Sequence, residues 1–278
     1  MKPVSDNSSP VAQLRWTQSA LPPRDPVAHK GDFGHVLVVG GDHGMSGALR
    51  LAGEASLRTG AGLVSAATRA DHAAMVSATR PELMSHGVES VAVLTPLLRR
   101  ATVLVVGPGL GQGEWGRKLF SAVLDSSLPM VVDADALNLL AAEPLRRDNW
   151  ILTPHVGEAT RLLQQSVEQV QTDRLKTAAA LQQKYGGVVV LKGAGTVVVD
   201  NSGEISVCSE GNPGMASGGM GDVLTGVIAG LLAQGCSLGE AARQGVCLHA
   251  HAADIAAEDG QRGLLASDLF PVLRRLLD

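Results

Sequence analysis

The segment GNPGMASGGMGD (Gly211–Asp222) runs directly into the apolar segment VLTGVIAGLLAQG (Val223–Gly235). Glycines permit positive φ angles and let the backbone approach a ligand closely. A helix N-terminus adds unpaired N–H groups and a partial positive charge, which suit a phosphate or a developing oxyanion. The two segments therefore predict an anion-binding loop in front of a packed helix. The alternative is a surface loop in which Asp222 only caps the helix.

Short β-branched runs recur along the chain, and most lack polar alternation, which is typical of buried strands. We predict strands at His35–Val39, Leu63–Ala67, Thr102–Val106, Met130–Val132, Val188–Leu191, Thr196–Val199 and Ile205–Cys208. We predict helices at Ala48–Thr59, Glu114–Leu124, Glu158–Gln164, Thr172–Lys184 and Asp222–Ala233. Strands that alternate with helices predict an α/β fold with a largely parallel sheet covered on both faces. The last two strands predict an antiparallel hairpin.

The composition excludes several classes of function. The 278 residues are 45% hydrophobic and 18% charged, which is typical of a globular protein with one sizeable core. Aromatic residues make up 3% and the formal net charge is −4, so the chain lacks the stacking platforms and basic excess of a nucleic-acid binder. The sequence contains no apolar run long enough to span a membrane. We expect neither a nucleic acid nor a membrane as partner.

The cysteines and the first residues bear on the cell compartment and the domain organisation. Cys208, Cys236 and Cys247 are far apart and include no CxxC pair, so they match neither a disulfide framework nor a zinc site. Free thiols and the lack of a signal-peptide core predict a cytoplasmic protein. Residues 1–30 are polar and proline-bearing, which predicts a flexible tail or the remnant of a linker before a single domain over residues 31–278.

Four further loops follow predicted strands, where α/β proteins bind ligands. GPGLG (107–111) is either a ligand-binding loop or a tight turn. The two aspartates of DAD (133–135) are candidates for contacts to Mg²⁺ or ribose, or for helix caps. His155 and Glu158 face one pocket if Glu158 opens a helix, and are otherwise solvated or capping residues. KGAGT (192–196) is a glycine turn whose amides are placed to meet a nucleotide.

A carboxylate beside an anion-binding loop suits one chemistry in particular. Asp222 can accept the proton of a substrate hydroxyl while backbone amides hold the phosphoryl group being transferred. The chain contains neither a Walker motif, nor a GxGxxG fingerprint, nor the HRD and DFG motifs of protein kinases. We therefore predict phosphoryl transfer in a fold outside those classes.

His249 and His251 lie in a helical stretch among alanines. Their HxH spacing does not place both on one helical face. We interpret them as packing or surface residues.

Together these segments resemble a known family, the NAD(P)H-hydrate dehydratases of the ribokinase-like superfamily. The resemblance is carried by HKGDFGHVLVVGGDHGMSGALRLAGEASLRTGAGLV, VVGPGLGQ, VVDADALNLL, LTPHVGEATRLL, VVLKGAGTVV and GNPGMASGGMGDVLTGVIAGLLAQG, in this order over about residues 29–235. It implies a three-layer ribokinase-like fold. It also implies a repair lyase that converts the S epimer of hydrated NADH or NADPH back to NADH or NADPH at the expense of ADP or ATP. The implied route phosphorylates the ring hydroxyl and then eliminates phosphate.

The resemblance also implies roles for individual residues. Asp222 is the expected base. The hydrated dinucleotide is expected to contact Ala48, Gly109, His155 and Asp222. The adenine nucleotide is expected to contact Lys192, Gly193, Ala194, Gly195, Thr196 and Gly221, and the anion hole to comprise Gly218, Gly219 and Gly221. Glu158 matches the glutamate of the superfamily's Mg²⁺ motif, whereas His155 stands where relatives have asparagine.

The family also implies partners. Many bacterial members are fused to an N-terminal epimerase domain, and members tend to form homotetramers, so we expect a homo-oligomer that works with an NAD(P)H-hydrate epimerase. Whether this chain is stand-alone or trimmed from such a fusion stays open at this point. Two other hypotheses also stay open: a ribokinase-like kinase of a vitamin-precursor alcohol, and a non-catalytic nucleotide-binding module, in which Asp222 would have no use.

Overall fold

The continuous β-branched runs of the sequence form the centre of one mixed sheet. The structure, a computed structural model, describes residues 11–17, 21–78 and 80–277. Within these residues the strands are β1 (Ala12–Leu14), β2 (His35–Val39), β3 (Leu63–Thr68), β4 (Leu83–Gly87), β5 (Val103–Val106), β6 (Met130–Val132), β7 (Trp150–Leu152), β8 (Val188–Leu191), β9 (Thr196–Val199) and β10 (Ile205–Cys208). Their order is β1-β10-β9-β8-β7-β6-β5-β2-β3-β4. Neighbouring strands pair in parallel except β9, which is antiparallel to β8 and β10, so the predicted parallel sheet and hairpin are both confirmed.

Alternate residues of the central strands face two separate cores, because successive side chains of a strand point to opposite faces. In β2, Val36 and Val38 belong to one apolar cluster, and Leu37 and Val39 to the other. All four side chains are fully buried. A strand buried on both faces needs no polar alternation, which explains its continuous apolar sequence.

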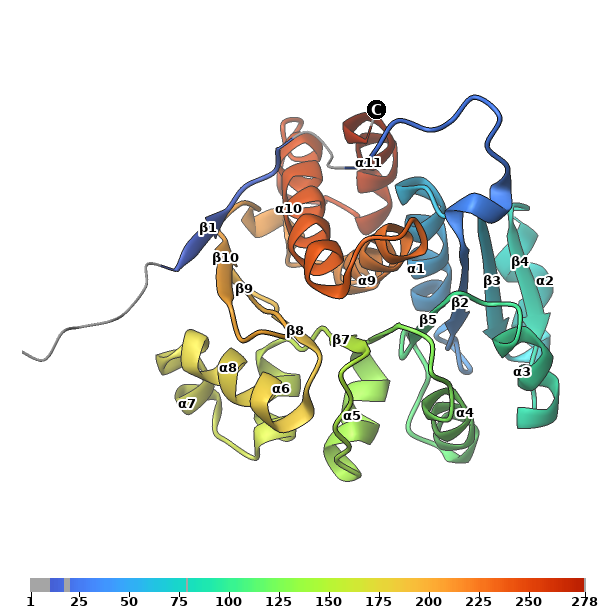
Figure 1. The fold of residues 1–278 in the computed structure, drawn as a ribbon, viewed down its shortest axis with the longest axis horizontal. Helices are drawn as coiled ribbons and strands as arrows, with labels where there is room; N and C mark the ends of the chain where they lie inside the picture. The colour runs from blue at the N-terminus through green and yellow to red at the C-terminus, as the bar shows by residue number, and fades with distance from the viewer. Residues whose placement is uncertain (1–10, 18–20, 79, 278) are drawn as a thin grey trace, which may run out of the picture.

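Helices cover both faces of the sheet. They are α1 (Ser46–Thr59), α2 (Ala70–Ala78), α3 (Val91–Leu98), α4 (Glu114–Leu124), α5 (Ala134–Ala142), α6 (Val156–Leu163), α7 (Val167–Thr172), α8 (Arg174–Tyr185), α9 (Met220–Ala233), α10 (Leu238–Ala256) and α11 (Leu269–Leu276), with 3₁₀ turns at Lys30–Phe33, Pro213–Met215 and Ala266–Asp268. In Figure 1, α1, α9, α10 and α11 lie on one side of the sheet, and α4, α5, α6 and α8 lie on the other. This arrangement confirms the three-layer α/β fold.

Small residues let α1 and α9 touch through their backbones. A Cβ atom added to Gly226 of α9 would lie 2.1 Å from the carbonyl oxygen of Ala52 in α1. The Ser56 hydroxyl of α1 donates to the carbonyl oxygens of both Ala52, at 2.9 Å, and Gly226, at 3.0 Å. This close contact explains the small residues in the apolar segment and fixes the direction in which the N-terminus of α9 points.

Several predicted boundaries are wrong. The predicted helix Thr172–Lys184 is α8, which begins two residues later: Thr172 ends α7, and Asp173 caps α8 by accepting a hydrogen bond from the Lys176 N–H at 2.9 Å. Helices α6 and α9 each begin two residues before their predicted starts. The strand β4, with the sequence LMSHG, was not predicted because it contains no β-branched residue.

Part of the predicted tail is built into the fold. Ala12–Leu14 pair in parallel with β10, and the Trp16 N–H donates to Glu210 Oε2 at 2.8 Å. The guanidinium of Arg24 stacks over the Phe33 ring, 3.7 Å from its centroid. The prediction of a flexible tail is therefore wrong for these residues, while residues 1–10 and 18–20 of that segment lie outside the described part of the chain.

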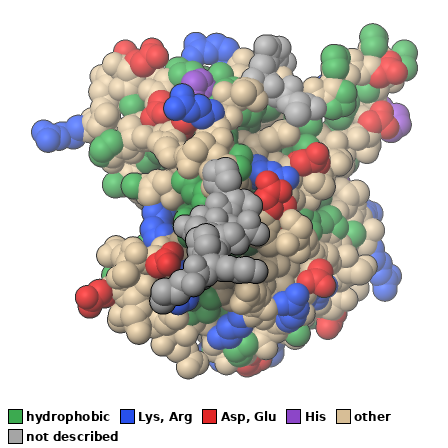
Figure 2. Space-filling view, turned by 60° about the vertical axis from the view of Figure 1, so that its left-hand side comes forward, with side chains coloured by type: hydrophobic (Ala, Val, Ile, Leu, Met, Phe, Trp, Pro, Cys, Tyr) green, Lys and Arg blue, Asp and Glu red, His purple; other side chains and the backbone are tan. Residues whose placement is uncertain are grey.

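The surface agrees with the charge composition. On the face of the molecule in Figure 2, acidic and basic side chains are interspersed. Among the described helices, none combines the length and the apolar character needed to cross a membrane.

Candidate active site

The predicted site residues gather at the carboxyl ends of the parallel strands, in front of α9. The loops after β2, β5, β6, β7 and β8 all emerge at this edge of the sheet, because these strands run in parallel. In α/β folds this is the edge at which ligands bind. The contacts among these loops show which of the predicted residues meet.

The N-terminus of α9 carries the glycine loop and Asp222. Gly219 is the N-cap, with a φ of +91°, and among the described residues no side chain caps the helix. The first N–H groups of a helix lack intrahelical acceptors. Asp222 lies in the first turn rather than at the cap, so the alternative that it only caps the helix is wrong. Around Gly218, no described atom lies within 4 Å of an added Cβ, so this part of the loop is open.

Lys192, in the loop after β8, points at the start of α9. Its Nζ donates to Asp133 Oδ1 at 2.6 Å and lies 3.9 Å from Glu158 Oε2. A Cβ atom added to Gly221 would lie 3.3 Å from the same Nζ. Burial acts to lower the pKa of Lys192, but Asp133 and Glu158 raise it overall, so the ammonium stays charged beside the glycine loop.

Asp133 is the buried anchor of this lysine. It is 1% exposed, and besides Lys192 it accepts a hydrogen bond from the Thr225 hydroxyl of α9, from Oγ1 to Oδ2 at 2.9 Å. It occupies the N-cap position of α5, yet its side chain makes no capping bond there. Asp135 accepts a hydrogen bond from the Gly111 N–H at 2.9 Å, and so joins the loop after β6 to the loop after β5.

The pKa of Asp222 is raised to about 7. Burial is the main cause; the negative charges of Asp133 and Asp135 add to it, and the Lys192 ammonium opposes it. A carboxylate with such a pKa is partly ionised at neutral pH and can both accept and release a proton.

Glu158 and His155 form a capping box at the start of α6. The Glu158 N–H donates to His155 Nδ1 at 3.3 Å, and the His155 N–H donates to Glu158 Oε2 at 2.8 Å. Burial, with the charge of Asp133, raises the pKa of Glu158 to about 7 against the opposing effect of Lys192. The imidazole of His155 is half exposed, and its Nε2 lies 3.2 Å from Glu158 Oε1. The two side chains are therefore in contact, as expected for residues that face one pocket.

Ala48 and Gly109 meet where the loop after β5 contacts the start of α1. Gly109 has a φ of +59°, and an added Cβ would lie 2.6 Å from the Met45 carbonyl oxygen and 3.4 Å from Ala48 Cβ. Any side chain at Gly109 would therefore displace the start of α1. The Asp135–Gly111 hydrogen bond places this pair next to the carboxylates.

The turn Gly193–Thr196 is held by a residue that the sequence did not single out. Arg174 donates to the carbonyl oxygens of Leu191, at 3.0 Å, and Ala194. The Thr196 hydroxyl donates to the Gly193 carbonyl oxygen at 3.0 Å, which closes the turn. Arg174 is the first residue of α8, and no sequence pattern around it predicts a contact with a turn about 20 residues further along the chain.

His249 is the second residue that sequence reasoning undervalued. It is 5% exposed, hydrogen-bonds with the backbone of Met220 at the start of α9, and lies in the field of Lys192. Burial lowers its pKa to about 4, so the imidazole is neutral. Among the described residues, its Nε2 has no hydrogen-bond partner. The interpretation as a packing residue is confirmed, whereas His251 is partly exposed and lies beside Glu210.

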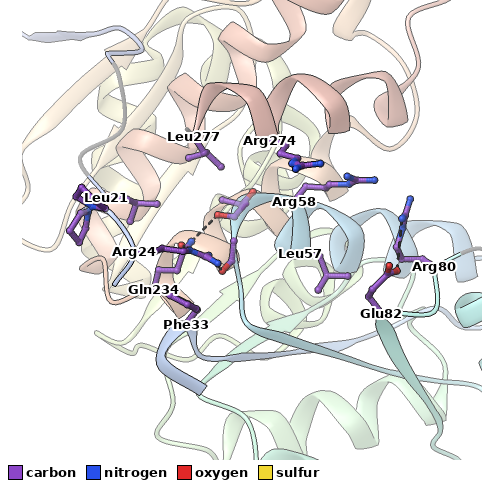
Figure 3. Close-up of a pocket in the computed structure, with 14 residues that line it drawn as sticks. Leu21, Arg24, Phe33, Leu57, Arg58, Arg80, Glu82, Gln234, Arg274 and Leu277 are labelled. Atoms are coloured by element: carbon purple, nitrogen blue, oxygen red, sulfur yellow. Dashed lines mark hydrogen bonds and ion pairs between the residues drawn. The ribbon is translucent and has the colours of Figure 1, made fainter. Parts of the chain in front are cut away.

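A cavity of about 920 Å³ lies away from all of these residues, at the amino end of the sheet. It is bordered by the end of α1 and the end of α9. In Figure 3, Arg58, Arg80 and Arg274 lie along one side of it, and Arg24 and Phe33 along the other. None of the predicted site residues lines it.

The fold and the site define a ribokinase-like protein. A solved structure of a ribokinase-like superfamily protein from Enterococcus faecalis is 30% identical, with a TM-score of 0.85 over 92% of this chain and 91% of that one. The ADP/ATP-dependent NAD(P)H-hydrate dehydratase of Bacillus subtilis, co-crystallised with ATP/Mg²⁺, is also 30% identical, with a TM-score of 0.81 over 92% and 93%.

The family follows from the sequence comparisons. A family model described as NAD(P)H-hydrate dehydratase matches residues 36–275, and the chain belongs to this family. The bifunctional NAD(P)H-hydrate repair enzyme Nnr of Coxiella burnetii is 58% identical over 259 residues, which cover 93% of this chain and 53% of that protein. The ADP-dependent (S)-NAD(P)H-hydrate dehydratase of Neisseria meningitidis is 42% identical over 260 residues, covering 90% and 86%. The chain thus spans about half the length of its bifunctional relatives.

Proposed function

We propose that the chain dehydrates the S epimer of hydrated NADH and NADPH, with ADP or ATP as phosphoryl donor. Its family and the activity named for the Neisseria meningitidis relative support this reaction. The observation that carries the proposal is the meeting of Asp222, Lys192 and the uncapped N-terminus of α9. Together they supply a proton acceptor, a cation and amide donors at one place.

Asp222 is the base of the proposed reaction. As the substrate's ring hydroxyl attacks the terminal phosphorus, the O–H bond breaks and its proton passes to the Asp222 carboxylate. The new O–P bond forms while the bond between this phosphorus and the nucleotide breaks, which leaves AMP from ADP or ADP from ATP. A pKa of about 7 leaves much of Asp222 ionised and ready for this step at neutral pH.

Phosphorylation solves the problem of the leaving group. Hydroxide leaves carbon poorly, whereas phosphate leaves well. The lone pair of the ring nitrogen expels the phosphate as the C–O bond breaks, and loss of a proton from the neighbouring ring carbon restores the double bond. The product is the dihydronicotinamide, with phosphate and the shortened nucleotide released.

The remaining residues bind and orient the reactants. In this proposal the amides of Gly218, Gly219 and Gly221 and the Lys192 ammonium hold the transferred phosphoryl group, where preorganised donors are most effective. The nucleotide occupies Lys192, Gly193, Ala194, Gly195 and Thr196, whose turn is held by Arg174. The hydrated dinucleotide contacts Ala48, Gly109 and His155.

The carboxylates at this edge fit Mg²⁺. Mg²⁺ prefers oxygen ligands and is usually held through one or two carboxylates together with substrate phosphates and water. Glu158 and Asp133 are buried carboxylates that both lie within 4 Å of the Lys192 ammonium, and Asp222 and Asp135 add further negative charge nearby. We assign Glu158 as the residue that would hold Mg²⁺, with Asp133 beside it. When bound, the ion neutralises charge on the phosphates.

The assembly and the partner enzyme also belong to this proposal. We infer a cytoplasmic homo-oligomer, a tetramer by family resemblance, that works with an NAD(P)H-hydrate epimerase. The bifunctional nature of the Coxiella burnetii relative supports the link to a second repair activity. Light scattering on purified protein tests the tetramer, and a monomeric mass would contradict it.

An absorbance assay tests the function. Purified protein and hydrated NADH are mixed with ADP, with ATP or with neither, each with Mg²⁺ or with a chelator, and the reduced-nicotinamide band is followed. We expect the band to recover only with a nucleotide and Mg²⁺, with stoichiometric release of phosphate. If the band does not recover although the protein binds adenine nucleotides, the dehydratase assignment is wrong and a small-alcohol kinase takes its place.

A further inference from the structure

Two cysteines that lie 39 positions apart meet beneath the glycine loop. Cys208 ends β10 and Cys247 lies on α10, and their side chains are 1% and 3% exposed. Ligand atoms of Cys208, Glu210 and Cys247 all lie within 4.8 Å of one another. The sequence spacing, with no CxxC pair, gave no indication of this cluster.

A fourth side chain, His251, lies next to this group of three. His251 follows Cys247 by four residues on α10, one helical turn along the same face. Its Nδ1 lies 3.6 Å from Glu210 Oε1. Glu210 Oε2 is already held by the Trp16 N–H at 2.8 Å, which fixes the carboxylate with Oε1 toward the imidazole.

We propose that Cys208, Cys247 and Glu210 form a zinc-binding site, with the adjacent His251 turned in as its fourth ligand. Zn²⁺ takes four ligands from cysteine, histidine and carboxylate side chains in a tetrahedron, in which neighbouring ligand atoms are about 3–4 Å apart. The group supplies two sulfurs, one nitrogen and one oxygen, a donor set that favours zinc over Mg²⁺ or Ca²⁺. This site is separate from Glu158 and does not depend on the proposed reaction.

The surroundings favour a cation. Asp254, one further turn along α10, adds negative charge near Cys208. Zinc binds the thiolate, and binding releases the thiol protons to solvent.

The position of the site gives it a structural role. Glu210 directly precedes the glycine loop, and Asp254 accepts hydrogen bonds from the N–H of Gly211 and from Asn212 Nδ2, both at 2.9 Å. A zinc ion bound to Cys208 and Cys247 ties β10 to α10 at the point where this loop begins. We therefore expect zinc to raise the thermal midpoint of the protein, by roughly 10 °C at a zinc concentration about a thousandfold above Kd.

Cobalt and zinc titrations test the site. Protein prepared with a phosphine reductant and freed of metal by a chelator is titrated with Co²⁺, then with Zn²⁺. We expect one Co²⁺ per chain with the visible bands of tetrahedral coordination and a thiolate-to-cobalt band in the near ultraviolet, all lost on addition of one equivalent of Zn²⁺.

Variants distinguish this site from adventitious binding. Cys208→Ser and Cys247→Ser should each abolish the thiolate band and weaken zinc binding at least about a hundredfold, and His251→Ala by roughly 10–100-fold. Cys236→Ser is the matched control, since Cys236 lies outside the cluster, and it should bind zinc as the wild type does. Circular dichroism establishes that each variant is folded.

Three results would overturn the proposal. The first is a cobalt spectrum without a thiolate band. The second is zinc affinity that survives Cys208→Ser in a folded protein. The third is a Cys208–Cys247 disulfide in protein purified under reducing conditions, measured by counting free thiols, because a disulfide removes both sulfur ligands.

Discussion

The two ends of the sheet each hold a cluster of buried charge, but the balance of charge is opposite. At the carboxyl end, Lys192 faces Asp133 and Glu158, with Asp222 close by. At the amino end, Glu54 is 4% exposed and pairs with three arginines, Arg50, Arg58 and Arg80, of which Arg58 and Arg80 line the cavity of Figure 3. One end has too few cations for its carboxylates, and the other has more than its carboxylate needs.

The difference separates the proposed site, whose charge a bound ligand would balance, from a cluster whose charge is balanced on folding. A buried carboxylate without full compensation costs free energy, which the protein lowers by raising the pKa. Glu158 and Asp222 both show this effect, with pKa values raised to about 7. The Glu54 cluster is compensated from within the chain, and its arginines reach solvent.

The largest expected effect is that of Asp222→Asn, which removes the proposed base at the carboxyl end. We expect turnover of hydrated NADH to fall by roughly 10²–10⁴, the usual contribution of a general base, with nucleotide affinity largely kept. The absorbance assay gives the rate, and calorimetry gives the affinity. Asp125→Asn, at the exposed end of α4, is the control. Wild-type turnover in Asp222→Asn would end the assignment of Asp222 as base.

Gly221→Val tests the close approach of Lys192 to α9. The added Cβ would begin 3.3 Å from Lys192 Nζ, so the larger side chain displaces the ammonium and blocks the phosphoryl group. We expect a loss of about 10²-fold in kcat, comparable with the loss of one oxyanion donor. Gly113→Ala, at a position open on all described sides, is the control and should leave kcat unchanged. An active Gly221→Val enzyme would place the phosphoryl group elsewhere.

Glu158→Gln and Glu54→Gln should change stability in opposite directions. The pKa of Glu158 is about 7 in the folded protein and 4.5 in the unfolded chain. The free energy of unfolding therefore falls as pH rises between these two values, because the unfolded chain ionises more readily. Glu158→Gln should therefore raise the free energy of unfolding by about 2–3 kcal/mol at pH 8 and change little at pH 4.5.

Glu54→Gln is the counterpart at the amino end. It removes the only negative partner that the described residues show in common for Arg50, Arg58 and Arg80, and should lower the free energy of unfolding at pH 8 by about 1–3 kcal/mol. Urea unfolding at pH 4.5 and 8 measures both variants. If both variants changed the free energy of unfolding at pH 8 in the same direction, the two clusters would not differ in charge balance as described.

The smallest expected effect is on the pH profile. Because the proposed reaction uses Asp222, with its pKa of about 7, as the base, kcat/KM should fall about tenfold for each pH unit below that value and level off above it. Asp135→Asn removes a negative charge that raises the pKa of Asp222, so the midpoint should move to lower pH. A midpoint unchanged in Asp135→Asn would mean that another group controls the profile.

Local patterns account for what the sequence predicted correctly. The β-branched runs and the glycine loop gave the parallel sheet, the hairpin and the edge at which the site lies, because strand composition and glycine turns are properties of short segments. The loops predicted to follow strands do follow them, for the same reason. Helix starts were less certain: Asp222 follows a glycine N-cap, and nothing local shows that the helix already begins at Met220.

Contacts between distant segments account for what the sequence missed. The Lys192–Asp133 pair joins residues 59 positions apart, and it depends on β6 and β8 flanking β7 in the sheet. Arg174, His249 and the meeting of Cys208 with Cys247 depend in the same way on which elements become neighbours. The polar sequence of the first residues hid β1, whose place in the sheet comes from the edge that β10 offers.

The contact between α1 and α9 sets when the site's orientation is decided. Because Gly226 meets the backbone of Ala52 with no side chain between them, few rotamers remain to reorder at that junction. In the proposed reaction, the amides at the start of α9 therefore take their final direction once, when the chain folds, and are not turned again as charge moves in each catalytic cycle. Solvent dipoles would have to reorient at every turnover. With fixed amides in their place, the free energy of that reorientation does not contribute to the activation barrier of the proposed reaction.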